Sequence, residues 1–304
     1  MKIFLKLLTT KYNQRQGELI MHGKSIELSL ANGTADSIVT AELSNWNGKA
    51  IKIPRIEISD CTRKDLQEPG VYFLFCKDED NDGDSVYIGE AENVKERLVQ
   101  HLRDAAAEKE KYYWNTAVIF IGRDLNKALI RYLENRLVEL AKSSNRYEIL
   151  TKNTYKNTVL KESQVAAMEE FLDNIKVLIN ALGYKVLEPL RQVSSSDKEQ
   201  RENLLYLKAG SADAIGTVTA EGFVVLAGAK INEKTSEKSL SKGMVKLRKK
   251  HFDAGHISAD LVTTEDILFS SSSAAADFVT GYSVSGPATW KNKNGKTLKE
   301  IESK

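Results

Sequence analysis

The sequence predicts an α+β fold divided into separate units along the chain. Short apolar runs bounded by turn residues are typical of strands, and amphipathic stretches with a period of about 3.6 residues are typical of helices. A polar segment at 191–203 is typical of a linker, and 304 residues leave room for two or more domains. The expected divisions are a β accessory segment at 1–60, an α/β unit at 61–154 with a central three-stranded antiparallel sheet flanked by helices, a helix with a polar linker at 155–205, and a separate α+β unit at 206–304.

Composition and charge are those of an ordinary globular protein. Hydrophobic residues make up 41% and charged residues 28%, and the formal net charge of +2 gives no general argument for nucleic-acid binding. The apolar runs are too short to span a membrane, and the basic, apolar start at 1–8 lacks a cleavage site, so we expect a first strand there and no membrane partner. Cys61 and Cys76 match no zinc spacing and indicate a reducing compartment, so we expect a cytoplasmic protein.

The N-terminal segment is expected to be mainly β. Apolar and polar residues alternate at 26–30 and 37–43, and the Asn-Gly pair at 32–33 between them is typical of a hairpin turn. This pattern predicts a small accessory sheet that leads into the α/β unit.

Two aromatic-rich apolar runs follow, at 70–75 and 85–89. Both predict buried strands, and the polar stretch between them, with an Asp-Gly pair at 82–83, predicts a β-hairpin with a long acidic loop. Side chains alternate between the faces of a strand, so Tyr72 and Tyr87 share a face if the hairpin register allows it.

The pattern then changes to that of a helix. Asn93, with Glu96 three residues later, is typical of a capping box that opens a helix. Arg97 and His101 are four residues apart, which places a permanent cation and a titratable imidazole one above the other on one face. Neighbouring positions form an apolar stripe at the same spacing: Val94, Leu98 and Leu102.

A third strand at 114–122 precedes a long helix. Asp124 is the expected N-cap, and the helix is expected to run to about Ser143. Glu134 has mostly apolar neighbours on this helix, so its carboxylate is expected to point inward, where it needs a partner or a metal. The expected core face consists of leucines: Leu125, Leu129, Leu133, Leu137 and Leu140.

The remaining chain predicts further helices and strands. Basic residues cluster at 242–250, and they either contact phosphates or form the solvated face of a helix. The expected elements are an amphipathic helix at 161–182, strands at 216–220 and 222–228, and helices at 241–251 and 274–280.

Taken singly, each polar residue of the α/β unit has an ordinary explanation. A strand tyrosine usually packs with its hydroxyl at the rim of the core, and arginine and histidine on an amphipathic helix are usually solvated. The combination is less ordinary, because phenols, a guanidinium, an imidazole and a carboxylate come from two strands and two helices of one compact unit.

The order and spacing of these residues resemble the GIY-YIG nuclease family. That family has a G-[IV]-Y strand, a Y-I-G strand, an Arg about ten residues after the second Tyr, a His or Tyr four residues later, and a metal-binding Glu on a later helix. Here Tyr72, Tyr87, Arg97, His101 and Glu134 follow in that order. Other segments resemble a bacterial subfamily with a C-terminal domain of unknown function: Asn45-Trp46-Asn47-Gly48, Ile53-Pro54-Arg55, Arg131-Tyr132-Leu133-Glu134, and the tail with Phe269 and Trp290-Lys291.

The resemblance implies catalytic and metal-binding roles. Tyr72 would be the general base, and Tyr87, Arg97 and His101 would complete the catalytic set. Glu134 would bind one divalent metal ion, Mg²⁺ or Mn²⁺.

Substrate-binding positions are implied as well. Gly89 would let the backbone turn tightly into the following helix. Glu90 stands where some members carry Lys or Ser, and its carboxylate would either repel phosphate or assist the metal. Many members carry an Asn downstream of the Glu; Asn153 is the nearest candidate, with Thr151 and Asn145 competing for this position.

The implied function is a metal-dependent endonuclease that hydrolyses phosphodiester bonds in DNA, in repair, restriction or defence. The alternative is a catalytically weak or inactive GIY-YIG fold that acts as a DNA-binding or regulatory protein, and a third option is a scaffold whose C-terminal unit makes protein contacts. Residues 61–154 carry 15 basic and 17 acidic side chains, a net charge of −2, whereas 201–304 carry 15 and 12, a net charge of +3. A local basic patch or an accessory unit is therefore expected to help hold a polyanion.

Overall fold

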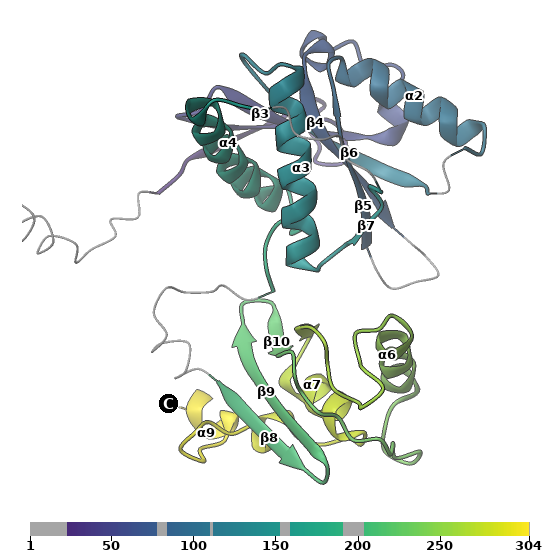
Figure 1. The fold of residues 1–304 in the computed structure, drawn as a ribbon, viewed down its shortest axis with the longest axis vertical. Helices are drawn as coiled ribbons and strands as arrows, with labels where there is room; N and C mark the ends of the chain where they lie inside the picture. Colours follow the sequence, from purple (N-terminus) through teal and green to yellow (C-terminus); the bar gives the residue numbers. More distant parts are fainter. Residues whose placement is uncertain (1–22, 78–83, 110–111, 153–158, 191–203, 304) are drawn as a thin grey trace, which may run out of the picture. The chain divides into compact units, whose positions relative to one another are not determined.

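The computed structural model describes residues 23–77, 84–109, 112–152, 159–190 and 204–303. They form two compact units, Met1–Glu188 and Pro189–Lys304, and both mix strands with helices (Figure 1), which confirms the α+β class. The expected first strand at 1–8, the turn at 82–83 and the linker at 191–203 lie outside the described residues.

A single sheet runs through the first unit. Within the described residues it has seven strands in the order β1-β2-β3-β6-β4-β5-β7, and all neighbours are antiparallel except β5 and β7. The strands are β1 (Ile26–Leu30), β2 (Val39–Leu43), β3 (Gly48–Pro54), β4 (Gly70–Lys77), β5 (Asp84–Ala91), β6 (Trp114–Gly122) and β7 (Glu148–Ile149).

The N-terminal strands do not form the expected accessory sheet of their own. β3 pairs with β6 along its whole length, from Gly48 opposite Gly122 to Pro54 opposite Thr116. The physical reason is that β6 is buried on both faces from Ala117 to Ile121, so it is an interior strand that needs a partner on each side. β3 is that second partner, and β1 and β2 extend the sheet beyond it.

The two faces of the sheet bury different side chains. On β4, Val71 and Phe73 belong to the core cluster covered by α3 and α4, whereas Tyr72 belongs to the cluster beneath α2. Across the hairpin, Tyr72 lies opposite Gly89 and Leu74 opposite Tyr87. The register therefore places both tyrosines on the α2 face, as alternation predicts.

Helix boundaries follow local capping chemistry. α2 (Val94–Ala106) begins after Asn93, whose side chain accepts a hydrogen bond from the N–H of Glu96 at 3.1 Å, so the expected cap is confirmed. The expected cap of α3 (Lys127–Ser144) is wrong: Asp124 has a φ of 67°, and the Asn126 side chain accepts from the first free N–H groups instead.

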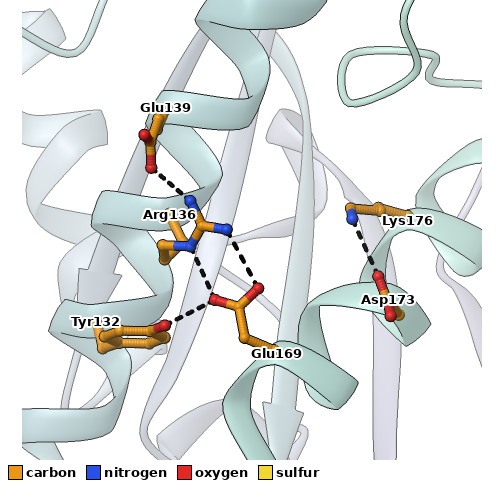
Figure 2. A network of polar contacts seen from close by, with 6 residues as sticks. All are labelled: Tyr132, Arg136, Glu139, Glu169, Asp173 and Lys176. Atoms are coloured by element: carbon orange, nitrogen blue, oxygen red, sulfur yellow. Dashed lines mark hydrogen bonds and ion pairs between the residues drawn. The ribbon is translucent and has the colours of Figure 1, made fainter. Parts of the chain in front are cut away.

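α4 (Glu162–Ala181) forms the predicted amphipathic helix and packs beside α3. At the outer rim of this contact Glu169 accepts hydrogen bonds from Tyr132 at 2.6 Å and from Arg136 at 2.8 and 3.2 Å (Figure 2). Arg136 also pairs with Glu139 on its own helix. These polar contacts join α3 to α4 where water can reach, while the apolar side chains face the sheet.

The second unit has its own sheet and core. Within the described residues its antiparallel strands lie in the order β11-β10-β9-β8, and Phe223, Phe278 and Trp290 are fully buried among its apolar side chains. Strands and helices occur where the sequence predicts them, but β8, β11, α8 and α9 were not expected. The elements are β8 (Leu205–Ala209), β9 (Ala212–Thr219), β10 (Gly222–Val225), α6 (Lys242–Asp253), β11 (Ile267–Phe269), α7 (Ser272–Thr280), α8 (Gly286–Thr289) and α9 (Leu298–Glu302).

Two short 3₁₀ helices complete the first unit, η2 (Arg55–Glu57) and η3 (Lys64–Gln67). In the part of the chain that the structure describes, no helix combines the length and the apolar character needed to cross a membrane.

Candidate active site

A pocket opens at the end of β5, where the sheet loses its outer strand. β7 pairs with Ser85 and Val86, and the Thr151 hydroxyl exchanges hydrogen bonds of 2.8 Å with the N–H and C=O of Ile88. Beyond Ile88 no described strand pairs with this edge of β5. The pocket there has a volume of about 640 Å³, and the side chains that matter most in its lining are Tyr72, Tyr87, Glu90, Arg97, Lys127 and Glu134.

Both faces of the sheet contribute to this pocket. Tyr72 and Tyr87 come from the α2 face, and Arg97 comes from α2 itself. Glu90 lies opposite Val71 in the register, so it points to the α3 face, where Glu134 projects from α3. The open edge of β5 is the place where side chains from the two faces can meet.

Tyr72 is the centre of a buried hydrogen-bond chain. Its hydroxyl lies 3.3 Å from Arg97 Nε and 3.0 Å from His101 Nε2. A guanidinium can only donate, so the phenol oxygen accepts from Arg97 and its own O–H is left to donate to His101. This arrangement requires a neutral imidazole with its proton on Nδ1.

The electrostatics agree with that assignment. Burial, assisted by Arg97 and Arg55, lowers the pKa of His101 to about 3, so the imidazole is neutral at physiological pH. Burial also raises the pKa of Tyr72 well above its usual value of 10, although Arg97 opposes the rise. Burial alone would lower the pKa of Arg97, but the hydroxyls of Tyr72 and Tyr87 raise it, so the guanidinium stays charged.

Tyr87 continues an aromatic row away from Tyr72. The two rings stack with centroids 6.2 Å apart, and Tyr87 stacks in turn on Tyr112 at 5.8 Å. The His101 ring makes edge contacts with the rings of both Tyr72 and Tyr87, with centroids 5.6 and 5.2 Å away. The row holds the phenol rings in fixed orientations at the pocket wall.

Gly89 is required for a reason other than the expected turn. It does not have a positive φ, whereas a Cβ at this position would lie 2.5 Å from the Tyr72 hydroxyl and 2.9 Å from the Tyr87 ring. The missing side chain therefore makes room for the phenol across the hairpin. The helix turn that follows is achieved without any special conformation at this residue.

Two glutamates approach each other on the α3 side. Glu90 is almost fully buried, and Lys127 Nζ lies 3.0 Å from each of its carboxylate oxygens, while Arg131 Nε lies 3.8 Å away. Burial, together with the negative charge of Glu90, raises the pKa of Glu134 to about 7. A nearby positive charge therefore stabilises both carboxylates, and Lys127 already supplies that charge to Glu90.

Glu134 fits the role of a metal ligand. Its side chain is buried, and its Oε2 atom has no hydrogen-bond partner. A buried carboxylate oxygen without a partner is costly, and a bound cation removes that cost. Among the described residues there is no cluster of three or more His, Cys, Asp or Glu side chains that could hold a metal.

These features agree with the comparison with protein families. The model of the GIY-YIG catalytic domain matches residues 68–148. This part of the chain is a GIY-YIG domain. A second family, a domain of unknown function (DUF4357), matches residues 205–302, so the expected combination of domains is confirmed. No curated protein and no solved structure matches the chain.

The residue downstream of the GIY-YIG match stays a prediction. Asn153 lies outside the described residues and beyond residue 148, where the match ends. Thr151 is buried with its hydroxyl hydrogen-bonded to Ile88, and Asn145 ends α3 in the left-handed conformation with a φ of 52°. Thr151 and Asn145 therefore both have structural roles in the fold.

Lys127 and Arg131 of the GIY-YIG domain were not expected in the site. Lys127 is the first residue of α3, a position where the helix dipole disfavours a cation. That unfavourable placement was the available signal. Gln100 was also missed; it accepts a hydrogen bond from Arg97 Nη1 at 2.7 Å and so helps to orient the guanidinium.

Proposed function

We propose that this protein is a metal-dependent endonuclease that hydrolyses phosphodiester bonds in DNA. The observation that carries the proposal is that Tyr72, Arg97 and Glu134 line one pocket, with the Tyr72 hydroxyl hydrogen-bonded to the guanidinium. Membership of a nuclease family supports the hydrolytic class. We assign Tyr72, Tyr87, Arg97 and His101 to catalysis and Glu134 to the metal.

Arg97 is the residue that grips the phosphate in this proposal. It lies in the pocket wall, remains charged, and is oriented by Gln100 and Tyr72. A guanidinium presents paired N–H donors that match the oxygens of a phosphate, and its interaction strengthens as negative charge develops during hydrolysis.

Tyr72 and His101 accept the proton that the attacking water loses. The resting phenol is protonated, because burial keeps its pKa high. As the phenol oxygen accepts a proton from the attacking water, its own proton shifts along the existing hydrogen bond to His101 Nε2, and the negative charge of a bound phosphate would favour this shift by raising the low pKa of the imidazole. Tyr87, stacked on Tyr72, orients the water or a phosphate oxygen.

Glu134 holds the divalent cation, Mg²⁺ or Mn²⁺. The cation would supply positive charge beside the scissile phosphate and the phenols, which favours ionisation of both phenol and water. Glu90 restrains Lys127 next to Glu134 and balances its charge, so we assign Glu90 to substrate positioning together with Gly89, which makes room for Tyr72.

The proposal also includes a cell compartment, the cytoplasm, and three pathways that the protein could serve. Cys61 and Cys76 form no disulfide within the described residues, and reduced cysteines are typical of cytoplasmic proteins. Repair, restriction and defence all use DNA endonucleases of this kind, and the proposal covers them equally.

The test is cleavage of supercoiled plasmid by the full chain in Mg²⁺ and in Mn²⁺. Glu134→Gln and Arg97→Gln are expected to lower the rate by at least about 10²-fold each, because each removes a charge aimed at the reacting phosphate. Glu139→Gln on α3 and Arg103→Gln on α2 are matched controls, since both side chains are exposed on the same helices. Equal cutting by wild type and by both pocket variants would show that the assignment is wrong.

The alternative is a DNA-binding protein whose GIY-YIG domain does not cut. One observation favours it: four glutamates line or rim the pocket, and the cations Lys127 and Arg131 are engaged by Glu90. Binding of DNA by wild type without any cleavage across Mg²⁺, Mn²⁺, Co²⁺ and Ni²⁺ would establish this alternative.

A further inference from the structure

The DUF4357 unit contains a basic pocket on the outer side of its edge strand. It has a volume of about 670 Å³, and Lys208, Lys291 and Lys293 line it beside the ring of Tyr206. Tyr206 and Lys208 alternate with the buried Leu205 and Leu207 along β8, so they project from the face of the sheet that points away from the core. The size is in the range of pockets that hold one nucleotide-sized ligand.

The loop that carries the lysines is held firmly. Lys291 exchanges backbone hydrogen bonds of 2.7 and 3.0 Å with Tyr206, so the loop is joined to the edge of the sheet. The Asn292 side chain accepts from the N–H groups of Asn294 and Lys296, at 3.0 Å each. Trp290, just before the loop, is fully buried and donates to the Ser272 carbonyl at 3.0 Å. A ligand at this site therefore meets a surface that is already ordered.

The charged side chains that line this pocket are all lysines. No carboxylate among the described residues lines it, and Lys291 and Lys293 form no ion pair within the described part of the chain. Lys208 is paired with Asp213 at 2.9 Å, but both side chains are largely exposed. Cations beside an open aromatic ring match a nucleic-acid strand, because phosphates are attracted to lysines and an unpaired base stacks on an aromatic face.

We propose that this pocket binds a single-stranded segment of DNA, with one base stacked on Tyr206 and the neighbouring phosphates on Lys291 and Lys293. The inference rests on the proposed function, because it assigns to the second unit the hold on substrate that the GIY-YIG domain lacks. The GIY-YIG pocket is rich in glutamates, and residues 61–154 carry a net charge of −2. A strand held by one part of a chain reaches a high effective concentration near the rest of that chain.

The experiment measures binding of a fluorescein-labelled oligo(dT) to the full chain by fluorescence anisotropy in EDTA, so that no cleavage occurs. Lys291→Gln with Lys293→Gln is expected to weaken binding and to reduce the slope of log affinity against log salt by about 1.4, because each phosphate contact on a single strand contributes about 0.7. Tyr206→Leu is expected to weaken binding by about fivefold or more with the slope unchanged, since base stacking does not release counterions.

The matched control is Lys234→Gln with Lys238→Gln, which removes the same charge from exposed positions between β10 and α6 in the same unit. It is expected to leave both the affinity and the salt slope as in wild type. Circular dichroism and thermal melting of every variant establish that the unit is folded. A second arm uses a blunt-ended DNA duplex, which has no unpaired bases and is expected to bind several-fold more weakly than oligo(dT).

Three results would overturn the inference: wild-type affinity in both pocket variants, an equal loss in the Lys234 and Lys238 control, or tighter binding of the duplex than of oligo(dT). Because binding is measured without metal, failure of this inference is distinguishable from failure of the proposed endonuclease, which is judged by plasmid cleavage in Mg²⁺ and Mn²⁺.

Discussion

The two faces of the seven-stranded sheet handle polar groups in opposite ways. On the face covered by α3 and α4 the side chains against the sheet are apolar except at the pocket, where Glu90 and Glu134 are buried, and the polar network of Tyr132, Arg136 and Glu169 stays at the outer rim (Figure 2). On the face covered by α2 the polar groups lie inside: Tyr72 and His101 are almost fully buried and hydrogen-bonded to each other.

This difference shows on which face of the sheet the domain bears the energetic cost of burying polar groups. Burial shifts the pKa values of Tyr72 and His101 toward the neutral forms, whereas at the α4 rim the hydrogen bonds between Arg136 and Glu169 shift both pKa values toward the charged forms. Outside the pocket the α3 and α4 face therefore has the character of a structural core, whereas the α2 face buries polar groups at a cost that a site for chemistry would explain. Changes on the α2 face are expected to alter cleavage, and changes at the α4 rim to alter stability.

The largest expected effect is that of Gly89→Ala. The added Cβ would lie 2.5 Å from the Tyr72 hydroxyl, so the phenol must move away from Arg97 and His101. Misplacing a catalytic group by about 1 Å costs roughly 10²-fold in rate, which we expect in the plasmid cleavage assay. Gly23→Ala is the control, because nothing lies within 4 Å of its Cβ position. A wild-type cleavage rate in Gly89→Ala would contradict the proposal that the position of the Tyr72 hydroxyl matters for cleavage.

The second prediction concerns acid stability. His101 has a pKa of about 3 in the folded chain against an ordinary value of 6.5, so the unfolded chain binds the extra proton between these values. The stability contributed by the neutral imidazole is complete above pH 6.5 and is lost as the pH falls toward 3. At 1.36 kcal/mol per pKa unit, the loss is on the order of 2 kcal/mol by about pH 4.5.

Urea unfolding of wild type and His101→Gln from pH 4.5 to 7.5 checks this prediction. The free energy of unfolding of the variant is expected to fall less steeply with decreasing pH, by up to one proton in slope. Parallel slopes for the two proteins would mean that burial of this imidazole has no energetic consequence, and the contrast between the faces would weaken.

A smaller effect is expected from Thr151→Val, which tests how the pocket edge is closed. The valine has the same shape but leaves the buried N–H and C=O of Ile88 without the Thr151 hydroxyl. Loss of two buried hydrogen bonds is expected to lower the free energy of unfolding by about 1–2 kcal/mol. Thr151→Ser, which keeps the hydroxyl, should recover most of that stability in the same urea titration.

The smallest expected effect is that of Glu169→Gln at the α4 rim. The network is partly exposed, so water screens it, and we expect a loss of about 0.5 kcal/mol that shrinks in high salt. Asp173→Asn breaks a more exposed pair with Lys176 on the same helix (Figure 2) and should change stability less. Cleavage should be unaffected by both; a large drop in cutting with Glu169→Gln would contradict the division between the two faces.

Local patterns predicted much of the GIY-YIG domain correctly. Alternation along 70–75 and 85–89 assigned Tyr72 and Tyr87 to one face, and the apolar neighbours of Glu134 predicted its burial. These predictions succeed because strand and helix periodicities are short-range properties that a sequence displays directly.

Other features depend on partners far away in the chain. Lys127 reaches Glu90 across 37 positions, and Tyr112 stacks on Tyr87 across a helix and a loop. No local pattern encodes these contacts.

Residue types and their spacing were thus enough to predict which polar groups this domain brings to its pocket and which strands and helices carry them. The folded arrangement alone established that β1–β3 extend the same sheet, that the pocket opens where β7 ends, and that Gly89 makes room for a phenol rather than for a turn. The physical reason is range: periodicity and capping act over a few residues, whereas sheet order, pocket position and displaced pKa values arise from burial by segments far apart in the chain.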